Sequence, residues 1–393
     1  MSKPTLSLRL TGAKVLCDGL LQEDTLAIEN GLITTGPLPE VDLTGYLLMP
    51  GIIDMHGDAF ERHIAPRPSA PFPLEMGLRA TDRDAAANGV TTAWLAQSWS
   101  WEGGHRGPEA AETLLAAMDH YRDHAVSDLR IQIRCETHTV DTGERLLSAV
   151  ERHKVDYVVF NNHLEEALYL AREKPNEIAL WAQKAGRTPE EHMRLVRAAF
   201  DQSPRVPRYL CAMAERFDAL GVRYGSHDDP DGDTRERYSV LGARICEFPT
   251  ARGPAAVAKA VGDHVVMGAP NIVRGGSQAG NINAARLVEE NLCDVLVSDY
   301  HYPALAKAAF RMVDDGLCDL PKAWAMISTN AAHIMGLSDR GTLVQGKRAD
   351  VAIVNAQTHA VEGTICAGRI THLTGEAAHR FFANQPTSRL AAE

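Results

Sequence analysis

The fold of this 393-residue chain can be inferred outward from one stretch, Leu48-Met49-Pro50-Gly51-Ile52-Ile53-Asp54-Met55-His56-Gly57-Asp58. After a Pro-Gly turn, a short apolar run ends abruptly in His-x-Asp, which is typical of a strand buried inside a parallel barrel. Residues two apart in a strand point to the same side, so we expect His56 and Asp58 to project together. Such a pair provides half of a metal site, although a lone His-x-Asp is more often a strand cap.

Alternating apolar and helical segments extend this pattern along the chain. The runs expected to form barrel strands are Ile52–Met55, Thr91–Leu95, Ile131–Cys135, Tyr157–Asn161, Arg223–Ser226, Ile245–Phe248, Val265–Met267 and Val295–Ser298. The helical stretches between them include Pro108–Ala125, Glu144–His153, Glu190–Leu220, Pro254–Val261, Ala284–Leu292, Pro303–Asp315 and Lys322–Met335. Eight such units predict an α/β fold with a (β/α)8 TIM-like barrel over residues 51–338.

The two chain ends differ from this central part. Residues 1–50 and 339–393 contain short strand-like pieces separated by turns, which predict a small flanking β-sandwich domain built from both chain ends. The segment 165–220 is longer and more charged than a barrel helix requires, and we expect it to form a lid or a dimer contact. The expected oligomer is a homodimer.

Composition excludes several classes of protein. The formal net charge of −11 argues against a nucleic-acid surface, so no nucleic acid is expected as a partner. No run of 18 apolar residues and no apolar leader is present, which predicts a cytoplasmic protein without a membrane partner. The seven scattered cysteines, without a C-x-x-C pair, favour neither disulfides nor a cysteine-rich zinc site.

Chemically active side chains follow the predicted strands, where barrel enzymes keep their active sites. The residues expected to converge there are His56, Asp58, Glu136, His163, His227 and Asp299. Converging carboxylates repel one another and resist burial unless a cation compensates them. The sequence therefore predicts a site for one or two divalent metal ions, with zinc, manganese and magnesium all compatible with mixed histidine and carboxylate ligands.

Each of these residues has an expected role. Two ions about 3.5–4 Å apart can share a carboxylate and a hydroxide, and Glu136 is the predicted bridge. His56 and Asp58 are expected to hold one ion, while His163 and His227 hold the other. Asp299 is the predicted general base beside the attacking water and an additional ligand.

The order of these residues resembles the amidohydrolase superfamily. Within it, the chain is similar over residues 47–355 to the α-D-ribose 1-methylphosphonate 5-triphosphate diphosphatase family of the carbon–phosphorus lyase pathway. The motifs that carry the resemblance are His56-x-Asp58, Pro66-Arg67-Pro68, Arg134-Cys135-Glu136, Ser226-His227-Asp228-Asp229, Glu247-Phe248-Pro249-Thr250, Met267 to Ser277, Gly280-Asn281 and Ser298-Asp299-Tyr300. The resemblance implies hydrolysis of a ribose 5-triphosphate between its α and β phosphates, with release of pyrophosphate.

A second set of residues fits an anionic small-molecule substrate. Glycines let backbone N–H groups approach phosphate oxygens, and an arginine grips two such oxygens at once. The residues expected to contact substrate are His63, Arg67, Asp228, Asn271, Arg274, Gly275, Gly276 and Ser277.

Several positions depart from the family pattern. After His163, Leu164-Glu165-Glu166 replaces the usual Pro-Gly-Gln run. Asn162 replaces Asp, Gln278-Ala279 replaces His-Ser, and Gly57 replaces Thr. These changes leave the predicted ligands in place. They keep open a related hydrolase that acts on an amide, a cyclic amide or another phosphorylated molecule, and a non-catalytic assembly subunit.

Overall fold

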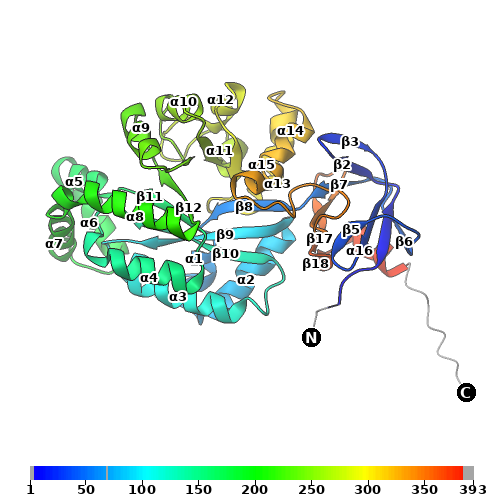
Figure 1. The fold of residues 1–393 in the computed structure, drawn as a ribbon, viewed down its shortest axis with the longest axis horizontal. Coiled ribbons are helices and arrows are strands. Elements are labelled where there is room, and N and C mark those ends of the chain that lie inside the picture. Colours follow the sequence, from blue (N-terminus) through cyan, green and yellow to red (C-terminus); the bar gives the residue numbers. More distant parts are fainter. Residues whose placement is uncertain (1–3, 68–69, 384–393) are drawn as a thin grey trace, which may run out of the picture.

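Eight parallel strands form the centre of the protein, which a computed structural model describes for residues 4–67 and 70–383. They are β8 (Ile52–Gly57), β9 (Val90–Trp99), β10 (Asp128–Glu136), β11 (Tyr157–Asn161), β12 (Arg223–His227), β13 (Ile245–Glu247), β14 (His264–Gly268) and β15 (Val295–Val297). Each strand pairs in parallel with the next along the chain. An isolated parallel bridge between Gly57 and Asp299 joins the first strand to the last. The predicted barrel is confirmed (Figure 1).

These strands are apolar because both of their faces are buried. Ile53, Tyr157 and Val295 belong to a cluster inside the barrel, whereas Ile131 and Ile133 belong to the larger core that includes the surrounding helices. Alternation along each strand therefore assigns one set of side chains to the interior and the other to the helices.

Helices and short 3-10 turns connect and cover the barrel strands. They are α1 (Phe60–Ile64), α2 (Leu74–Ala87), η1 (Gly104–Arg106), α3 (Pro108–Tyr121), η2 (Val140–Thr142), α4 (Gly143–His153), α5 (Leu164–Glu173), α6 (Pro175–Lys184), α7 (Pro189–Phe200), η3 (Ser203–Arg205), α8 (Val206–Leu220), α9 (Gly232–Val240), α10 (Arg252–Ala260), α11 (Ala269–Arg274), α12 (Ala284–Glu289), α13 (Ala304–Asp314), α14 (Leu320–Ala325) and α15 (Thr329–Ile334). Among the described residues, no helix is both long and apolar enough to cross a membrane.

The insertion differs from the single helix expected over Glu190–Leu220. Helix α7 ends at Phe200 and α8 begins at Val206, with Pro204 in the turn between them. Proline lacks the N–H that a helix interior needs, which explains the break. Similarly, the stretch expected over 322–335 divides into α14 and α15.

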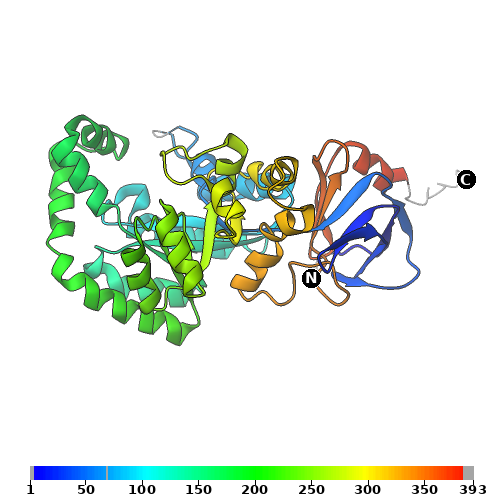
Figure 2. The same ribbon diagram turned by 90° about the horizontal axis from the view of Figure 1, so that it is seen from above.

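Helices α5, α6 and α7 form a unit of their own within this insertion. Leu164, Ile178 and Val196 share an apolar cluster separate from the main core. In both views the unit lies at the end of the barrel opposite the chain termini (Figure 2). The lid or dimer role of the insertion, and the homodimer itself, stay predictions.

Two further sheets pack beside the barrel. One has the order β5-β4-β1-β6 and the other the order β18-β17-β16-β7-β2-β3. The strands are β1 (Leu8–Thr11), β2 (Lys14–Cys17), β3 (Leu20–Glu23), β4 (Leu26–Glu29), β5 (Leu32–Thr34), β6 (Glu40–Asp42), β7 (Tyr46–Pro50), β16 (Val351–Asn355), β17 (Val361–Cys366) and β18 (Arg369–Leu373). The second sheet joins both chain ends because β7 pairs with β16, so the predicted flanking β-sandwich is confirmed. Helix α16 (Gly375–Ala383) packs on it through Ala377 and Phe381.

The predicted domain limits of 1–50, 51–338 and 339–393 stay predictions, since only Gly51 separates β7 from β8. Residues 1–3 and 384–393 of the predicted β domain, and Pro68 of the Pro-Arg-Pro motif, lie outside the described residues. All seven cysteines are free thiols in the structure.

Candidate metal centre

The predicted ligands all lie at the C-terminal edge of the barrel. His56 is on β8 and Asp58 follows it, Glu136 ends β10, His163 follows β11, His227 ends β12 and Asp299 follows β15. Because the C-terminal ends of parallel strands share one edge, residues distant in the chain meet there.

An irregularity in β8 turns His56 into the barrel. Ile53 and Met55 pack in the interior cluster, so strict alternation would turn His56 outwards. The pairing between β8 and β9 shifts register within residues 54–57. His56 consequently lies inside, where its Nδ1 is 2.8 Å from Oε2 of Glu247 on β13.

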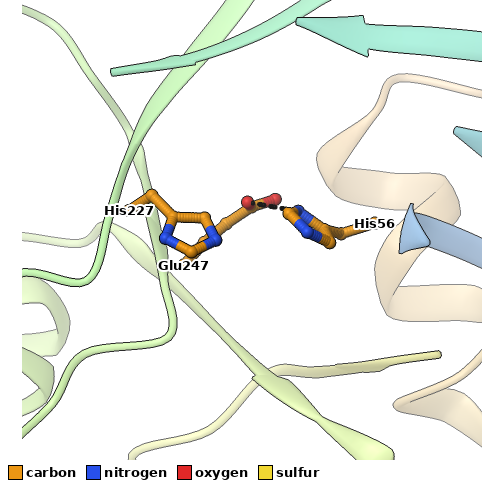
Figure 3. Close-up of side chains that lie close together, drawn as sticks. All are labelled: His56, His227 and Glu247. Atoms are coloured by element: carbon orange, nitrogen blue, oxygen red, sulfur yellow. Dashed lines mark hydrogen bonds and ion pairs between the residues drawn. The ribbon is translucent and has the colours of Figure 1, made fainter. Parts of the chain in front are cut away.

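His56, His227 and Glu247 form a group suited to a metal ion (Figure 3). One ligand atom from each residue lies within 4.8 Å of the other two. Ligands about 2.0–2.2 Å from one zinc ion are at most about 4.4 Å apart, so the spacing of these three atoms is close to what a single ion would require. This buried His/His/Glu group is consistent with a divalent metal site.

Glu247 is a site residue that the sequence did not assign. The strand was expected to continue through Phe248, which placed Glu247 within the strand instead of at its end. The signal that identifies it is its alternation with the interior residue Ile245. Its Oε1 accepts hydrogen bonds from Tyr157 Oη at 2.6 Å and Gln132 Nε2 at 2.8 Å, which leaves Oε2 for His56.

The Phe248 ring packs against both imidazole rings of the group. Its ring centroid lies 5.0 Å from that of His56 and 4.9 Å from that of His227. Asp228, Phe248 and Asp299 have φ values of 60°, 50° and 54°. Residues other than glycine rarely adopt this left-handed conformation, and such strain is concentrated at functional sites. The chain turns sharply at these strand ends, where Asp228 follows His227, Phe248 follows Glu247, and Asp299 is itself a predicted ligand.

The electrostatics of the two imidazoles differ. Burial opposes protonation of His56, but the Glu247 carboxylate outweighs it and raises the pKa. For His227, burial prevails over nearby Asp228 and lowers the pKa. A lowered pKa favours the neutral imidazole, which is the form that binds metals.

Glu136 and His163 form a second pair. Glu136 Oε1 is 2.5 Å from His163 Nδ1, and Oε2 accepts the His163 backbone N–H at 3.0 Å. Burial would lower the pKa of His163, but the Glu136 carboxylate raises it. This pair does not belong to the His/His/Glu group, and the predicted bridging role of Glu136 stays a prediction.

Asp58 and Asp299 meet through their backbones. The Asp58 N–H donates to the Asp299 carbonyl at 2.7 Å, and the Asp299 N–H donates to the His56 carbonyl at 3.0 Å. Burial raises the pKa of Asp299 to about 6, with His56 opposing and Asp58 supporting the shift. The predicted roles of Asp58 as a ligand and of Asp299 as a base and ligand stay predictions.

The predicted phosphate loop lies beside Asp299. Arg274 Nη1 is 3.1 Å from the Tyr300 hydroxyl, and Tyr300 follows Asp299. The Asn271 side chain already makes a hydrogen bond within the protein, because its Oδ1 accepts the Ala284 N–H at 3.1 Å. Gly275 has a φ of 79°, which only glycine adopts without strain, and it ends helix α11.

Of four other predicted substrate contacts, three bond to other groups of the protein and one is exposed. His63 pairs with Asp84 at 3.3 Å, and Arg67 is exposed. Ser277 accepts the Ala279 N–H at 3.2 Å, and the Gly276 N–H donates to the Asn271 carbonyl at 2.9 Å. None of these contacts involves the His/His/Glu group, and the substrate contacts of the four residues stay predictions.

Asp228 is the remaining predicted substrate contact, and it lies directly beside a predicted ligand. Its Oδ2 is 2.8 Å from Nδ1 of His227. Burial would raise the pKa of this carboxyl, but His227 outweighs burial and holds the pKa at about 2. Asp228 is therefore ionised beside the site, although its contact with substrate stays a prediction.

Comparison with known proteins identifies the family. No family model matches the chain. The chain is 31% identical over 364 residues to the alpha-D-ribose 1-methylphosphonate 5-triphosphate diphosphatase of Escherichia coli (strain K12), a match that covers 88% of this chain and 94% of that protein. The chain belongs to this family. It is therefore a hydrolase of the amidohydrolase superfamily.

Solved structures show the same fold at low sequence identity. An N-acetylglucosamine-6-phosphate deacetylase from Pasteurella multocida has a TM-score of 0.62 at 11% identity, covering 93% of this chain and 99% of that chain. A dihydropyrimidinase from Brevibacillus agri has a TM-score of 0.61 at 12% identity, covering 95% of this chain and 97% of that chain. These similarities concern the fold alone.

Proposed function

We propose that this protein is a metal-dependent diphosphatase that hydrolyses α-D-ribose 1-methylphosphonate 5-triphosphate. The products are the corresponding 5-phosphate and pyrophosphate, and the reaction belongs to phosphonate catabolism. The observation that carries the proposal is the 31% identity to the Escherichia coli diphosphatase over 88% of this chain.

The donor groups support a divalent cofactor. His56, His227 and Glu247 offer two nitrogens and one oxygen, a combination suited to zinc and also compatible with manganese. When bound, such an ion polarises a phosphoryl oxygen and lowers the pKa of water. Glu136 and His163 would hold a second ion.

Asp299 is well placed to handle the proton in this reaction. Burial raises its pKa to about 6, so the carboxyl can take a proton near neutral pH. The water oxygen bonds to the α phosphorus, and the bond from that phosphorus to the bridging oxygen breaks. The bridging oxygen leaves with pyrophosphate, and Asp299 receives the proton of the water.

The loop beside Asp299 supports recognition of a polyphosphate. Arg274 is exposed and its guanidinium lies 3.1 Å from Tyr300 Oη, next to the proposed base. An exposed guanidinium at this position can bind phosphate oxygens in a bidentate manner. Arg274 therefore serves as a contact for the leaving pyrophosphate.

The test is a ³¹P NMR assay of purified, metal-analysed protein with the ribose triphosphate as substrate. We expect pyrophosphate to be released, release to stop with a chelator, and readdition of zinc or manganese to restore it. Protein that contains metal but releases no pyrophosphate would contradict the proposed substrate. Turnover that persists in metal-free protein would contradict the proposed metal dependence.

A further inference from the structure

Strand β10 places an arginine between two layers of site residues. Gln132, Arg134 and Glu136 alternate onto the same face of the strand. Gln132 Nε2 donates a hydrogen bond to Glu247 Oε1 across the barrel at 2.8 Å, and Glu136 Oε1 lies 2.5 Å from His163 Nδ1. Since its two neighbours on this face point inwards, Arg134 also faces the barrel interior.

Arg134 is buried without a partner. Only 8% of the residue is exposed, and its Nε is fully enclosed with no hydrogen-bond acceptor. Among the described residues, no carboxylate lies within ion-pair distance of its guanidinium. A buried charge without a partner costs much free energy, so such a group indicates a missing ligand.

Comparison with the other buried arginines makes this position exceptional. Arg235 donates to Ser226 at 2.6 Å and pairs with Asp229 at 3.3 Å. Arg340 pairs with Asp128 at 2.7 Å. Arg235 and Arg340 thus each have a carboxylate partner, although Arg235 Nε also lacks an acceptor, whereas no described carboxylate pairs with Arg134.

Arg134 lies two residues before the predicted ligand Glu136, on the same face of β10. Glu136 ends β10, and this end shares the C-terminal edge of the barrel with His56, His163 and His227. The Nε of Arg134 is fully enclosed, and neither terminal nitrogen makes a hydrogen bond or ion pair with the described residues. The guanidinium is therefore available to a ligand inside the barrel.

We propose that Arg134 is a substrate-contacting residue that binds phosphoryl oxygens of the substrate inside the barrel. This inference rests on the proposed function and adds a cationic contact that the phosphate loop does not supply. A guanidinium fork matches two oxygens of one phosphoryl group and remains charged at every physiological pH. Arg134 thus favours phosphoryl substrates over uncharged amides.

Calorimetry with inorganic pyrophosphate tests the contact in protein that carries its metal ions. Arg134→Gln removes the charge, and we expect the affinity for pyrophosphate to fall about tenfold to a hundredfold, in line with the loss of charge-assisted hydrogen bonds. Metal content and the thermal unfolding midpoint should stay close to those of the wild type. Lower stability or metal content with unchanged pyrophosphate affinity would make Arg134 a structural counter-ion and overturn the inference.

Two further variants keep the test decisive. Arg134→Lys keeps the charge but loses the fork, so we expect the pyrophosphate affinity of this variant to fall severalfold. This test holds even if Arg134→Gln does not fold, and wild-type affinity in Arg134→Lys would overturn the inference.

Arg130→Gln is the matched control, because Arg130 lies on the same face of β10 and pairs with Asp128 at 2.9 Å and Asp156 at 2.6 Å. Its pyrophosphate affinity should be unchanged, and an equal loss would attribute the effect to strand β10 in general.

The wild-type assay separates this inference from the proposed function. If the protein binds pyrophosphate in an Arg134-dependent manner but does not hydrolyse the triphosphate, the proposed function fails and the phosphoryl contact stands. If the protein hydrolyses the triphosphate and Arg134→Gln keeps both KM and pyrophosphate affinity, the inference alone fails.

Discussion

His56 Nδ1 lies 2.8 Å from Glu247 Oε2, although 191 positions separate the two residues in the chain. The barrel brings the first strand opposite the sixth, and both side chains are buried. Tyr157 and Gln132 fix the other oxygen of Glu247. The carboxylate is therefore positioned before any ion arrives, which is the preorganisation that a metal site needs.

Replacing Glu247 should remove metal from the protein. Glu247→Gln keeps the size of the side chain but replaces a charged ligand oxygen, so we expect metal content to fall at least about tenfold. Metal analysis after dialysis measures it. Glu362→Gln is the control, because Glu362 bonds Tyr46 at 2.7 Å in the β domain and should leave metal content unchanged. Full metal occupancy in Glu247→Gln would remove Glu247 from the ligand set.

Replacing Asp299 should separate metal binding from turnover. Asp299→Asn cannot accept the proton of water, so we expect kcat to fall about 10²- to 10⁴-fold while metal content stays nearly intact. Steady-state kinetics and metal analysis of the same sample measure both. Asp315→Asn, which loses only a surface pair with Arg311 at 2.6 Å, should keep its rate. A near wild-type rate in Asp299→Asn would show that another group takes the proton.

Replacing Arg274 should weaken binding of the phosphorylated substrate. Arg274→Ala removes the exposed guanidinium beside Tyr300, and we expect KM to rise about tenfold with unchanged metal content. Arg286→Ala is the matched control, since Arg286 is also exposed and pairs with Glu290 at 3.0 Å. An unchanged KM in Arg274→Ala would exclude this loop as a phosphate contact.

Asp128 should make stability depend on pH far from the site. Burial would raise its pKa, but Arg130 and Arg340 outweigh burial and lower the pKa from 3.8 to about 2. A pKa that is lower in the folded state adds stability above about pH 4, and this stability disappears as the pH falls towards 2. Asp128→Asn should therefore lower the free energy of unfolding by about 2 kcal/mol at pH 7.

Urea unfolding at several pH values measures this effect. The difference between Asp128→Asn and the wild type should narrow as the pH falls from 5 to 3. A difference that stays constant over this range would show that the ionised carboxylate of Asp128 is not its source.

Much of the fold was predictable because the barrel strands are short apolar runs bounded by turns. Tyr157–Asn161 has the same limits in the prediction and the structure, and Ile52–Met55 is extended only to Gly57. Helix limits were less predictable. The break between α7 and α8 depends on Pro204, whose effect a helical periodicity conceals.

The candidate site was predictable in part, for a related reason. His56 and His227 stand where apolar runs end, so the strand pattern alone indicates them. Glu247 ends a strand of three residues, Ile245–Glu247, and this length could not be read from a run that continues into Phe248. The proposed role of Arg134 could not be read from the sequence, because the sequence does not show whether a charged residue within a strand has an ion-pair partner.

Hydrophobic periodicity and turn residues act locally, so the amino-acid pattern was enough to predict the barrel, the flanking β domain and the strand ends that carry the candidate ligands. The tertiary structure alone decided which of those ends meet. His56 enters the barrel only through the register shift within residues 54–57, and it then pairs with Glu247, while Glu136 pairs with His163 instead. Such pairings depend on the closure of the barrel and on side-chain distances across it, which no local pattern contains.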